Sequence, residues 1–375
     1  MKRALLLWVM SSIAVASSGS LAPTVGFYNW GGRYPTSMSE GVERIAQLGG
    51  HVVRIALSPT YYTDYNSGSG CYPGYSLSAI AREADVKRTL DNKSVTVFML
   101  TAYDGVTFGD CINQRWVNPS FYTSDNTAAL VQEYSDFTLY LSREYQHTKK
   151  RFIVSDWEDD NAVYCDAANA YATDAHARSE CDAIYAVKYK NSSPAESFQG
   201  LKLWFQARQQ GIAEGRSRAA AEGIKGTRVF FAPEFNSVHA LHDAGFLSVL
   251  YDVLPAVIVD YVSYSAYESI NAADPATTLT ADLNTIREVV GSSAVIVGEA
   301  GFSRSEWGDQ AVLRTEAVIA AAQAWGVAYI IQWNLYDSDP QDDFGLFDLD
   351  GNVTPIGAYF ESTLTSVRNH PVFSQ

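Results

Sequence analysis

The sequence has few cysteines, few cations and no long hydrophobic run beyond its first residues. Its 375 residues include four cysteines and six histidines, and 27 Lys and Arg stand against 42 Asp and Glu, a formal net charge of −15. An anionic chain without a basic block is a poor partner for nucleic-acid phosphates or anionic lipid. No later segment reaches the roughly 20 apolar residues of a membrane span. We therefore predict neither nucleic acid nor membrane as a partner.

Motifs for metals, nucleotides and serine-hydrolase chemistry are also missing. The chain has no HExxH, Walker loop, GxSxG or EF-hand, and no CxxC pair. The loop containing Asp337, Asp339, Asp342 and Asp343 is acidic enough for Ca²⁺, but a hydrophilic loop is the favoured interpretation. We therefore predict no cofactor and no metal.

The N-terminus has the pattern of a secretion signal. Two basic residues precede an apolar stretch over about residues 4–13, and Ala14-Val15-Ala16 offers small residues at a spacing suited to cleavage. We predict a signal peptide over residues 1–16, one catalytic domain over residues 17–375, and a secreted protein, extracellular or periplasmic.

The even number of cysteines fits export with two disulfides. Cys165 and Cys181 are close in sequence and are the easier pair, which leaves Cys71 and Cys111 to each other. Metal ligation is the competing interpretation, but no closely spaced Cys/His set supports it.

Apolar and aromatic residues are abundant, at 47% and 13% of the chain, which excludes a disordered protein. Strand-length apolar runs alternate with helical stretches eight times. The predicted strands are Thr24–Asn29, His51–Ser58, Ser94–Thr101, Arg151–Trp157, Thr227–Glu234, Val257–Tyr267, Ala294–Glu299 and Val327–Trp333. The predicted helices are Ser39–Leu48, Ser78–Leu90, Asn126–His147, Ser197–Glu222, Val238–Leu254, Thr280–Val290, Gln310–Trp325 and Pro355–Leu364.

This alternation predicts an α/β fold, a single (β/α)₈ TIM barrel. The long connections after strands two, three and four would lie on the C-terminal face of the strands, where barrel enzymes have their active sites. An open doubly wound sheet is the alternative, but it would usually place a Gly-rich phosphate turn after the first strand, and none follows Tyr28.

Two glutamates, Glu158 and Glu299, close predicted strands four and seven. Alternate residues before them are expected to face the barrel interior. These are Phe152, Val154 and Asp156 in strand four, and Val295 and Val297 in strand seven. Two carboxyl groups at one barrel mouth suit glycoside cleavage, in which one donates a proton and the other attacks. We assign Glu158 as acid/base and Glu299 as nucleophile; capping of the next helix, or pairing with an Arg, is the structural alternative.

Other strand-end residues are expected to bind substrate or to tune the glutamates. They are Arg54, Tyr267, Trp333, Trp30, Trp157, Asp156, Glu234 and Asn236. Arg54, inside an apolar strand, needs a carboxylate partner, either in the pocket or at the barrel base. Tyr264 and Tyr267 cannot both face inward on a regular strand, and Tyr267 is favoured. Glu234 fits a substrate ligand or a loop carboxylate equally well.

These strand ends resemble those of the clan A glycoside hydrolases, retaining (β/α)₈ enzymes with catalytic glutamates after strands four and seven. Val297-Gly298-Glu299-Ala300-Gly301 resembles the strand-seven nucleophile motif. Gln332-Trp333-Asn334, with the segment Phe344 to Asp348, is similar to the strand-eight tryptophan and closing segment of family five. Arg54 and Tyr267 match the strand-two arginine and strand-six tyrosine. The resemblance implies a retaining glycosidase for a poly- or oligosaccharide, and we expect a monomer.

Two positions depart from that pattern. Trp157 stands where the clan has an Asn that binds the 2-hydroxyl of the substrate, so that Asp156 or Asn161 would have to supply this contact. Ser265 stands where family five often has His.

Two alternatives remain open. Asp156-Trp157-Glu158 also resembles the end of the strand-four motif of family-eighteen chitinases, where the glutamate is the acid and the substrate's acetamido group attacks. A barrel that binds carbohydrate without cleaving it is the other.

Overall fold

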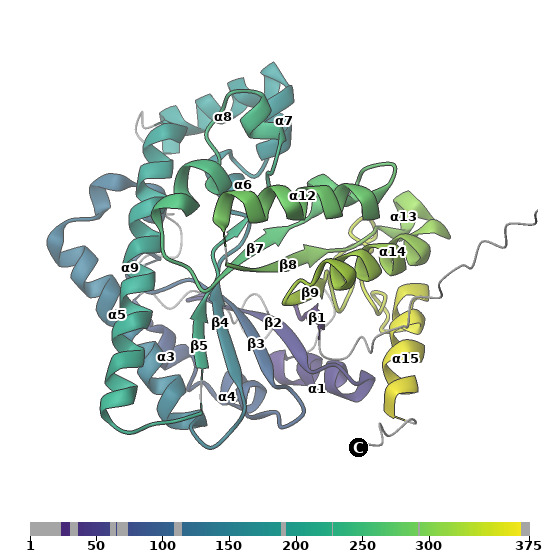
Figure 1. Cartoon of the computed structure of the whole chain (residues 1–375), viewed down its shortest axis with the longest axis horizontal. Helices are drawn as coiled ribbons and strands as arrows, with labels where there is room; N and C mark the ends of the chain where they lie inside the picture. Colours follow the sequence, from purple (N-terminus) through teal and green to yellow (C-terminus); the bar gives the residue numbers. More distant parts are fainter. Residues whose placement is uncertain are drawn as a thin grey trace, which may run out of the picture.

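Parallel strands form one continuous sheet at the centre of the computed structural model (Figure 1), which describes residues 24–30, 37–60, 65, 74–108, 115–188, 193–226, 228–291 and 293–368. The strand segments are β1 (Val25–Tyr28), β2 (Val52–Leu57), β3 (Val97–Ala102), β4 (Arg151–Ser155), β5 (Arg228–Phe231), β6 (Glu234–Phe235), β7 (Tyr261–Ser265), β8 (Ala294–Ala300) and β9 (Tyr329–Gln332). Their order is β5-β4-β3-β2-β1-β9-β8-β7-β6, and all paired neighbours are parallel.

The sheet closes because its two end segments, β5 and β6, belong to one strand. Only Ala232 and Pro233 separate them. The Ala232 N–H donates to the Val154 carbonyl beside β5 (2.9 Å), and the Pro233 carbonyl accepts from the Ser263 N–H beside β6 (2.9 Å). The chain thus pairs with one neighbour and then the other within a single strand. The predicted (β/α)₈ barrel is confirmed across the described residues.

Helices surround the barrel, with α5 packed along α9 on one flank and α7 and α8 projecting at the top of Figure 1. The described helices are α1 (Met38–Leu48), α3 (Leu77–Ile80), α4 (Ala84–Asp91), α5 (Ser124–Tyr145), α6 (Asp159–Val163), α7 (Ala168–Thr173), α8 (Ala175–Lys188), α9 (Pro194–Ala221), α10 (Ala240–Asp243), α11 (Tyr267–Ile270), α12 (Pro275–Val290), α13 (Arg304–Trp307), α14 (Gln310–Trp325) and α15 (Pro355–Arg368). Capping boxes at Ser37 and Ser193 start α1 and α9, which explains where these two helices begin.

Two predicted helices differ from the structure. The stretch Ser78–Leu90 is divided between α3 and α4. The stretch Val238–Leu254 is not continuous but forms α10 and two short turns, Val249–Val253 and Leu254–Ala256. Gly245, with φ of 80°, follows α10 in the left-handed region and interrupts the helical path.

The inward-facing residues of strands four and seven are not those predicted. The buried cluster inside the barrel comes from strands alone: Tyr28, Val52, Val97, Met99, Ile153, Ala232, Ile296, Tyr329 and Ile331. Phe152, Val154, Val295 and Val297 belong instead to the layer between strands and helices. The prediction of which residues face the barrel interior was wrong because both faces of these strands are apolar. The sequence pattern therefore does not reveal which set of alternate residues points inward.

The disulfide between Cys165 and Cys181 is confirmed, with 5.6 Å between the Cα atoms. It ties the loop after α6 to α8. Cys71 and Cys111 lie outside the described residues, as does the predicted signal peptide.

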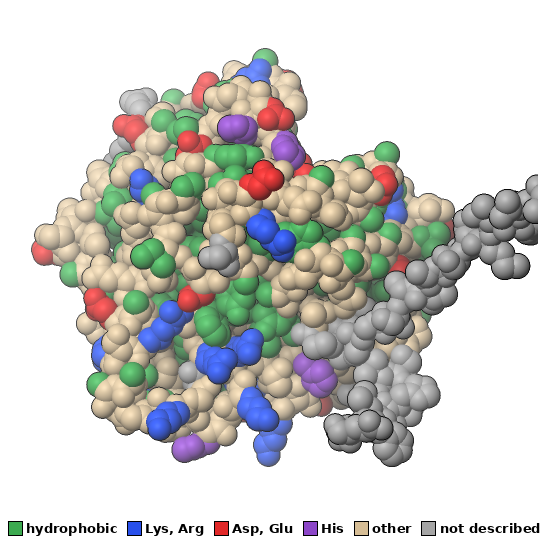
Figure 2. All heavy atoms as spheres, viewed as in Figure 1, with side chains coloured by type: hydrophobic (Ala, Val, Ile, Leu, Met, Phe, Trp, Pro, Cys, Tyr) green, Lys and Arg blue, Asp and Glu red, His purple; other side chains and the backbone are tan. Residues whose placement is uncertain are grey.

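The surface carries charges of both signs. Figure 2 shows Asp and Glu side chains scattered over the upper half and left margin of one face, with Lys and Arg mainly in the lower half. Among the described helices, none combines the length and apolarity required to cross a bilayer.

Candidate active site

Glu299 reaches the barrel mouth through a bulge in β8. Because Val297 faces the helices, regular alternation would also send residue 299 outward. The register with β7 shifts at this point: Tyr264 pairs with Val297, but Ser265 pairs with Glu299. The extra residue, Gly298, turns Glu299 back to the interior, where it is 2% exposed.

Gly298 is confined by its neighbours. A Cβ at this position would lie 2.0 Å from Glu234 Oε2 and 2.1 Å from Ser263 Oγ. Its carbonyl accepts a hydrogen bond from Arg54 Nη1 at 2.9 Å. Any side chain here would push against the Glu234 carboxylate, so the bulge requires glycine.

Glu158 enters the site through a break in regular backbone geometry. It has φ of 40° and ψ of 60°, in the left-handed region, between the end of β4 and the start of α6. Its carboxylate accepts from Ser265 Oγ and Asn161 Nδ2, both at 2.5 Å. Burial raises the pKa of Glu158 to about 7. This carboxyl group can therefore hold or release a proton near neutral pH.

Arg54 and Glu234 form a fully buried ion pair beside the two glutamates. Arg54 Nη1 and Nη2 donate to the two carboxylate oxygens of Glu234 at 2.8 and 2.9 Å. Arg54 Nη1 also lies 3.3 Å from Glu299 Oε1. One guanidinium thus supplies positive charge to two carboxylates.

Asp156, expected to contact substrate, lies below the pocket and is fully buried. Its carboxylate accepts from the Glu234 N–H at 2.5 Å and pairs with Arg208 of α9. Val154 faces the helices, and Asp156, two residues further along the chain, points to the same side. Asp156 therefore holds the start of β6 against α9, and Asn161 is the polar neighbour that lines the pocket.

The pocket beside Glu158 has a volume of about 230 Å³. It is lined by Glu158, Asn161, Asp166, Ala167, Ala168, Asn169, Ala170, Asn236 and Tyr267. Burial, together with the charges on Glu299 and Glu158, raises the pKa of Tyr267 well above its usual range, so its phenol remains a hydrogen-bond donor. Tyr264 is fully buried elsewhere, stacked on Phe235.

Three tryptophans border the two glutamates. Trp333 packs edge-on against Tyr28 with ring centroids 4.9 Å apart, and Trp30 lies 6.2 Å from Trp333. Trp157 is 37% exposed, and its side chain is among the groups that lower the pKa of Glu299. Aromatic faces of this kind suit the apolar faces of sugar rings.

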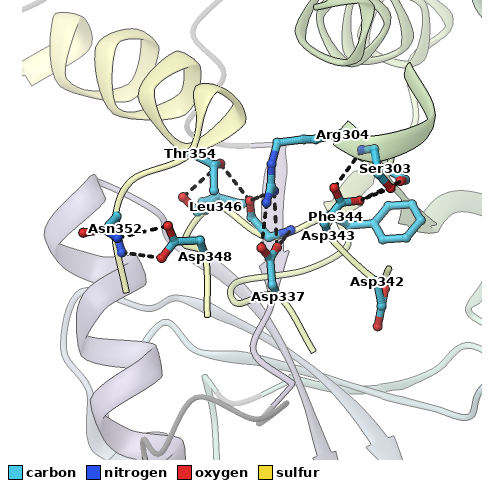
Figure 3. A network of polar contacts seen from close by, with 12 residues as sticks. Ser303, Arg304, Asp337, Asp342, Asp343, Phe344, Leu346, Asp348, Asn352 and Thr354 are labelled. Atoms are coloured by element: carbon cyan, nitrogen blue, oxygen red, sulfur yellow. Dashed lines mark hydrogen bonds and ion pairs between the residues drawn. The ribbon is translucent and has the colours of Figure 1, made fainter. Parts of the chain in front are cut away.

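The acidic loop after β9 is occupied by its own ion pairs and turns (Figure 3). Asp337 pairs with Arg304 at 2.6 Å, and Asp343 accepts from Ser303 Oγ at 2.6 Å. Asp342 is directed away from this network in Figure 3; burial raises its pKa, and the Trp333 side chain is the first group that opposes this shift. Sequence reasoning missed Asp342, since nothing in the sequence distinguishes it from its acidic neighbours. In the described ranges, no group of His, Cys, Asp and Glu residues is arranged to hold a metal ion.

The structure thus brings most of the predicted site residues together. Those at the mouth are Glu158, Glu299, Tyr267, Trp333, Trp30, Trp157 and Asn236, and those below it are Arg54, Glu234 and Asp156. Ser265, noted only as a departure from family five, proves to be a direct partner of Glu158.

Similar folds occur among solved structures. GH5_18 from Streptomyces cattleya, in complex with GlcNAc, aligns with a TM-score of 0.58 and 12% identity over 95% of this chain and 83% of its own. GH5_18 from Bifidobacterium longum subsp. longum aligns with a TM-score of 0.55 and 14% identity over 93% and 80%. The apo β-glucosidase 1317 aligns with a TM-score of 0.55 and 13% identity over 88% and 87%. The chain shares the barrel fold of these structures.

The similarity of this barrel to known proteins is confined to structure. No protein-family model matches the sequence, and no curated protein matches it at a significant level. The fold expected from the strand-end motifs is therefore confirmed by tertiary structure at 12–14% identity.

Proposed function

We propose that the protein is a secreted glycoside hydrolase that cleaves O-glycosidic bonds by a retaining double displacement. The observation that carries this proposal is the proximity of Glu158 and Glu299 in unlike environments: Ser265, which pairs with Glu299 between β7 and β8, donates to the Glu158 carboxylate. Each carboxyl group is an electrostatic neighbour of the other, and Arg54 is a neighbour of both. Neutral donors surround Glu158, whereas Glu299 adjoins the guanidinium. Such a division separates an acid from a nucleophile.

In the first step, the Glu299 carboxylate attacks the anomeric carbon of the bound sugar. The bond from that carbon to the glycosidic oxygen breaks, its electron pair stays on the oxygen, and Glu158 supplies the proton. A covalent glycosyl–enzyme and a free alcohol result.

In the second step, the Glu158 carboxylate takes a proton from water. The water oxygen bonds to the anomeric carbon, and the bond to Glu299 breaks with its electron pair returning to the carboxylate. Two inversions leave the anomeric configuration unchanged.

Arg54 favours the ionised form of Glu299 against the effect of burial. Burial raises the pKa of Glu299 well above its usual range, and Arg54 is the main group that opposes this shift. Tyr267 and Asn236 offer hydrogen bonds to the substrate, and Trp333 with Trp30 provides an aromatic surface for a sugar ring.

The structural neighbours suggest which sugars to test first. GH5_18 from Streptomyces cattleya is described in complex with GlcNAc, and a variant of it with Manb1-4GlcNAc. We propose a β-linked poly- or oligosaccharide as substrate. The disulfide of Cys165 and Cys181, with the predicted signal peptide, supports export.

A substrate panel with NMR detection of the released anomer tests this proposal. It includes aryl β-glycosides, chitin oligomers, Manb1-4GlcNAc and plant, fungal and algal polysaccharides. We expect hydrolysis with initial release of the β-anomer. Initial release of the α-anomer would overturn the retaining mechanism.

Two variants separate the alternatives. A family-eighteen-like chitinase would remain active as Glu299→Gln and lose activity as Glu158→Gln, because the substrate's acetamido group would replace the nucleophile. If the barrel only binds carbohydrate, the wild-type protein would bind sugars and release no reducing ends.

A further inference from the structure

Asn161 of α6 forms hydrogen bonds through its backbone and through both ends of its side-chain amide. Its N–H donates to Asn236 Oδ1 at 3.1 Å, and its carbonyl accepts from the Asp166 N–H at 2.8 Å. In the side chain, Oδ1 accepts from the Ala168 N–H at 2.9 Å, and Nδ2 donates to Glu158 Oε2 at 2.5 Å. Asn161 therefore links the Glu158 carboxyl group to the start of α7 and to the residue that follows β6.

The Ala168 N–H determines which end of the Asn161 amide faces Glu158. A backbone N–H can only donate, so it selects the amide oxygen and leaves the NH₂ group for the carboxyl group. The segment that contains Ala168 is held in turn by the disulfide between Cys165 and Cys181, which joins it to α8. A tethered part of the chain thus presents the donor to Glu158.

The Asn161 donor complements the one from Ser265 of β7. Ser265 Oγ donates to Glu158 Oε1, whereas Asn161 Nδ2 donates to Oε2, so each carboxyl oxygen has its own partner. Two contacts from different elements fix both the position of the carboxyl group and its rotation. Removing the Asn161 donor would leave the carboxyl group free to rotate about its contact with Ser265.

We propose that Asn161 is a positioning residue that orients the Glu158 carboxyl group for proton transfer to the glycosidic oxygen. This inference rests on the proposed role of Glu158 as acid/base. It gives Asn161 a task distinct from the contact with the substrate 2-hydroxyl that the sequence suggested.

Asn161→Asp tests the proposal because it isolates the contact with Glu158. An aspartate has nearly the same shape and still offers an oxygen to the Ala168 N–H, but it has no NH₂ group to donate. We expect kcat/KM, which reports the first step, to fall by about 10- to 100-fold on alkyl glycosides and by less than about threefold on dinitrophenyl glycosides, which need no proton. Equal losses on both substrates, or no loss on alkyl glycosides, would overturn the proposal.

Asn92→Asp is the matched control. Asn92 Oδ1 also accepts from a backbone N–H, that of Ser94 at 2.9 Å, and its Nδ2 also donates to a glutamate, Glu43 Oε2, at 3.0 Å. Asn92 lies between α4 and β3, at the ends of the strands opposite the pocket. Asn92→Asp should therefore match the wild type on both substrates, and circular dichroism checks that both variants are folded.

Other charged and titratable groups also act on Glu158. Burial raises its pKa, Glu234 adds to this shift, and Arg54 opposes it. Glu158 in turn adds to the burial that raises the pKa values of Glu299 and Tyr267. All four groups are unchanged in Asn161→Asp, so an altered titration of Glu158 reports the change at residue 161.

A second measurement needs no substrate. The side-chain carboxyl groups of isotope-labelled glutamate are titrated by carbon NMR in the wild type, Asn161→Asp, Asn92→Asp and Glu158→Gln, which identifies the Glu158 signal by its absence. Labelling glutamate alone keeps the introduced aspartate out of the spectrum. We expect the midpoint of the Glu158 signal to move upward in Asn161→Asp and to stay in place in Asn92→Asp, because a donor that favours the ionised form is replaced by a second carboxyl group.

The two measurements fail in different ways. An unchanged midpoint in Asn161→Asp would overturn the contact with Glu158 and the proposal with it. Absence of hydrolysis across the substrate panel would instead overturn the proposed function and leave the titration to decide whether Asn161 holds the Glu158 carboxyl group.

Discussion

The carboxyl ends of β4 and β8 each bring one glutamate beside the Arg54–Glu234 ion pair by different means. In β8 the strand continues and one extra residue, Gly298, reverses the alternation so that Glu299 turns inward. In β4 the strand stops, and the left-handed backbone of Glu158 redirects its side chain. Regular alternation along the two strands turns Val154 and Val297 toward the helices. Functional carboxylates are thus placed by local irregularities in otherwise regular strands.

The two ends also differ in electrostatics. Glu299 lies beside Arg54, whereas Glu158 accepts hydrogen bonds from the neutral side chains of Ser265 and Asn161. The Arg54 guanidinium forms ion pairs with Glu234 and Glu299. Glu158 has no direct contact with Arg54 among the ion pairs of the described residues. In the proposed mechanism the proton therefore resides on Glu158, the carboxyl group without a direct contact to Arg54.

Replacing the two glutamates in turn gives the largest expected effect. Glu299→Gln should lower kcat by about 10⁴-fold or more on every substrate, because the nucleophile is lost. Glu158→Gln should cost about 10²- to 10⁴-fold on substrates with alkyl leaving groups, and much less on dinitrophenyl glycosides, whose leaving group needs no proton. Steady-state kinetics on both substrate types measures this contrast; equal losses on both would contradict the division of roles.

Gly298→Ala tests the bulge. The added Cβ would collide with Glu234 and Ser263, so we expect loss of about 2–3 kcal/mol of unfolding free energy and about 10²-fold or more in activity. Gly211→Ala on α9 is the control, because its Cβ would lie 2.5 Å from the Val131 carbonyl, remote from the pocket. Urea unfolding and kinetics should show that both variants are destabilised and that Gly298→Ala alone loses activity. Equal activity losses would refute a role for the bulge.

The pH dependence of activity sharpens the electrostatic contrast. Since burial raises the pKa of Glu158 to about 7, kcat/KM should fall as pH increases through that value and the acid loses its proton. The decrease at low pH should follow protonation of Glu299. Profiles of the wild type on an alkyl and on a dinitrophenyl glycoside check the assignment, because only the alkyl leaving group needs the proton; an equally steep alkaline limb on both substrates would belong to another group.

Stability should also depend on Glu158. Its folded-state pKa, about 7, exceeds the ordinary 4.5, so the protonated form stabilises the fold at low pH and this contribution is lost as pH rises through 7. Glu158→Gln, which cannot ionise, should gain about 1–3 kcal/mol over the wild type at pH 8 relative to pH 4. Urea denaturation at the two pH values measures the difference, and a pH-independent change would contradict it.

The smallest effect is expected at Asp342. The Trp333 side chain is the first group that opposes the burial-raised pKa of Asp342. We expect the Asp342 carboxylate to orient that indole, so Asp342→Asn should raise KM by about two- to fivefold and leave the melting temperature unchanged. Asp337→Asn, which breaks the pair with Arg304, should lower the melting temperature instead. Kinetics and thermal unfolding of the two variants distinguish substrate positioning from loop stability; a shared loss of stability would show that Asp342 is structural.

Sequence reasoning identified the strands that carry the site but not how their ends are oriented. The ends of β4 and β8 were recognisable because Glu158 and Glu299 follow apolar runs, and buried carboxylates at such positions are costly without a role. The residues predicted to face the barrel interior were wrong for both strands, and Asp156 was predicted to lie in the pocket for that reason. Ser265 as a partner of Glu158 was beyond reach, because this contact joins segments distant in sequence.

Alternating apolar runs and helical stretches by themselves determined a (β/α)₈ barrel, because strands covered on both faces and separated by helices have few other ways to bury their surfaces. The strand-end carboxylates likewise marked which face holds the site. Only the tertiary structure decided which way each side chain points, because a one-residue bulge at Gly298 and a single left-handed residue at Glu158 leave composition and periodicity unchanged. It also decided which carboxylate adjoins Arg54, since that proximity arises from closing the barrel.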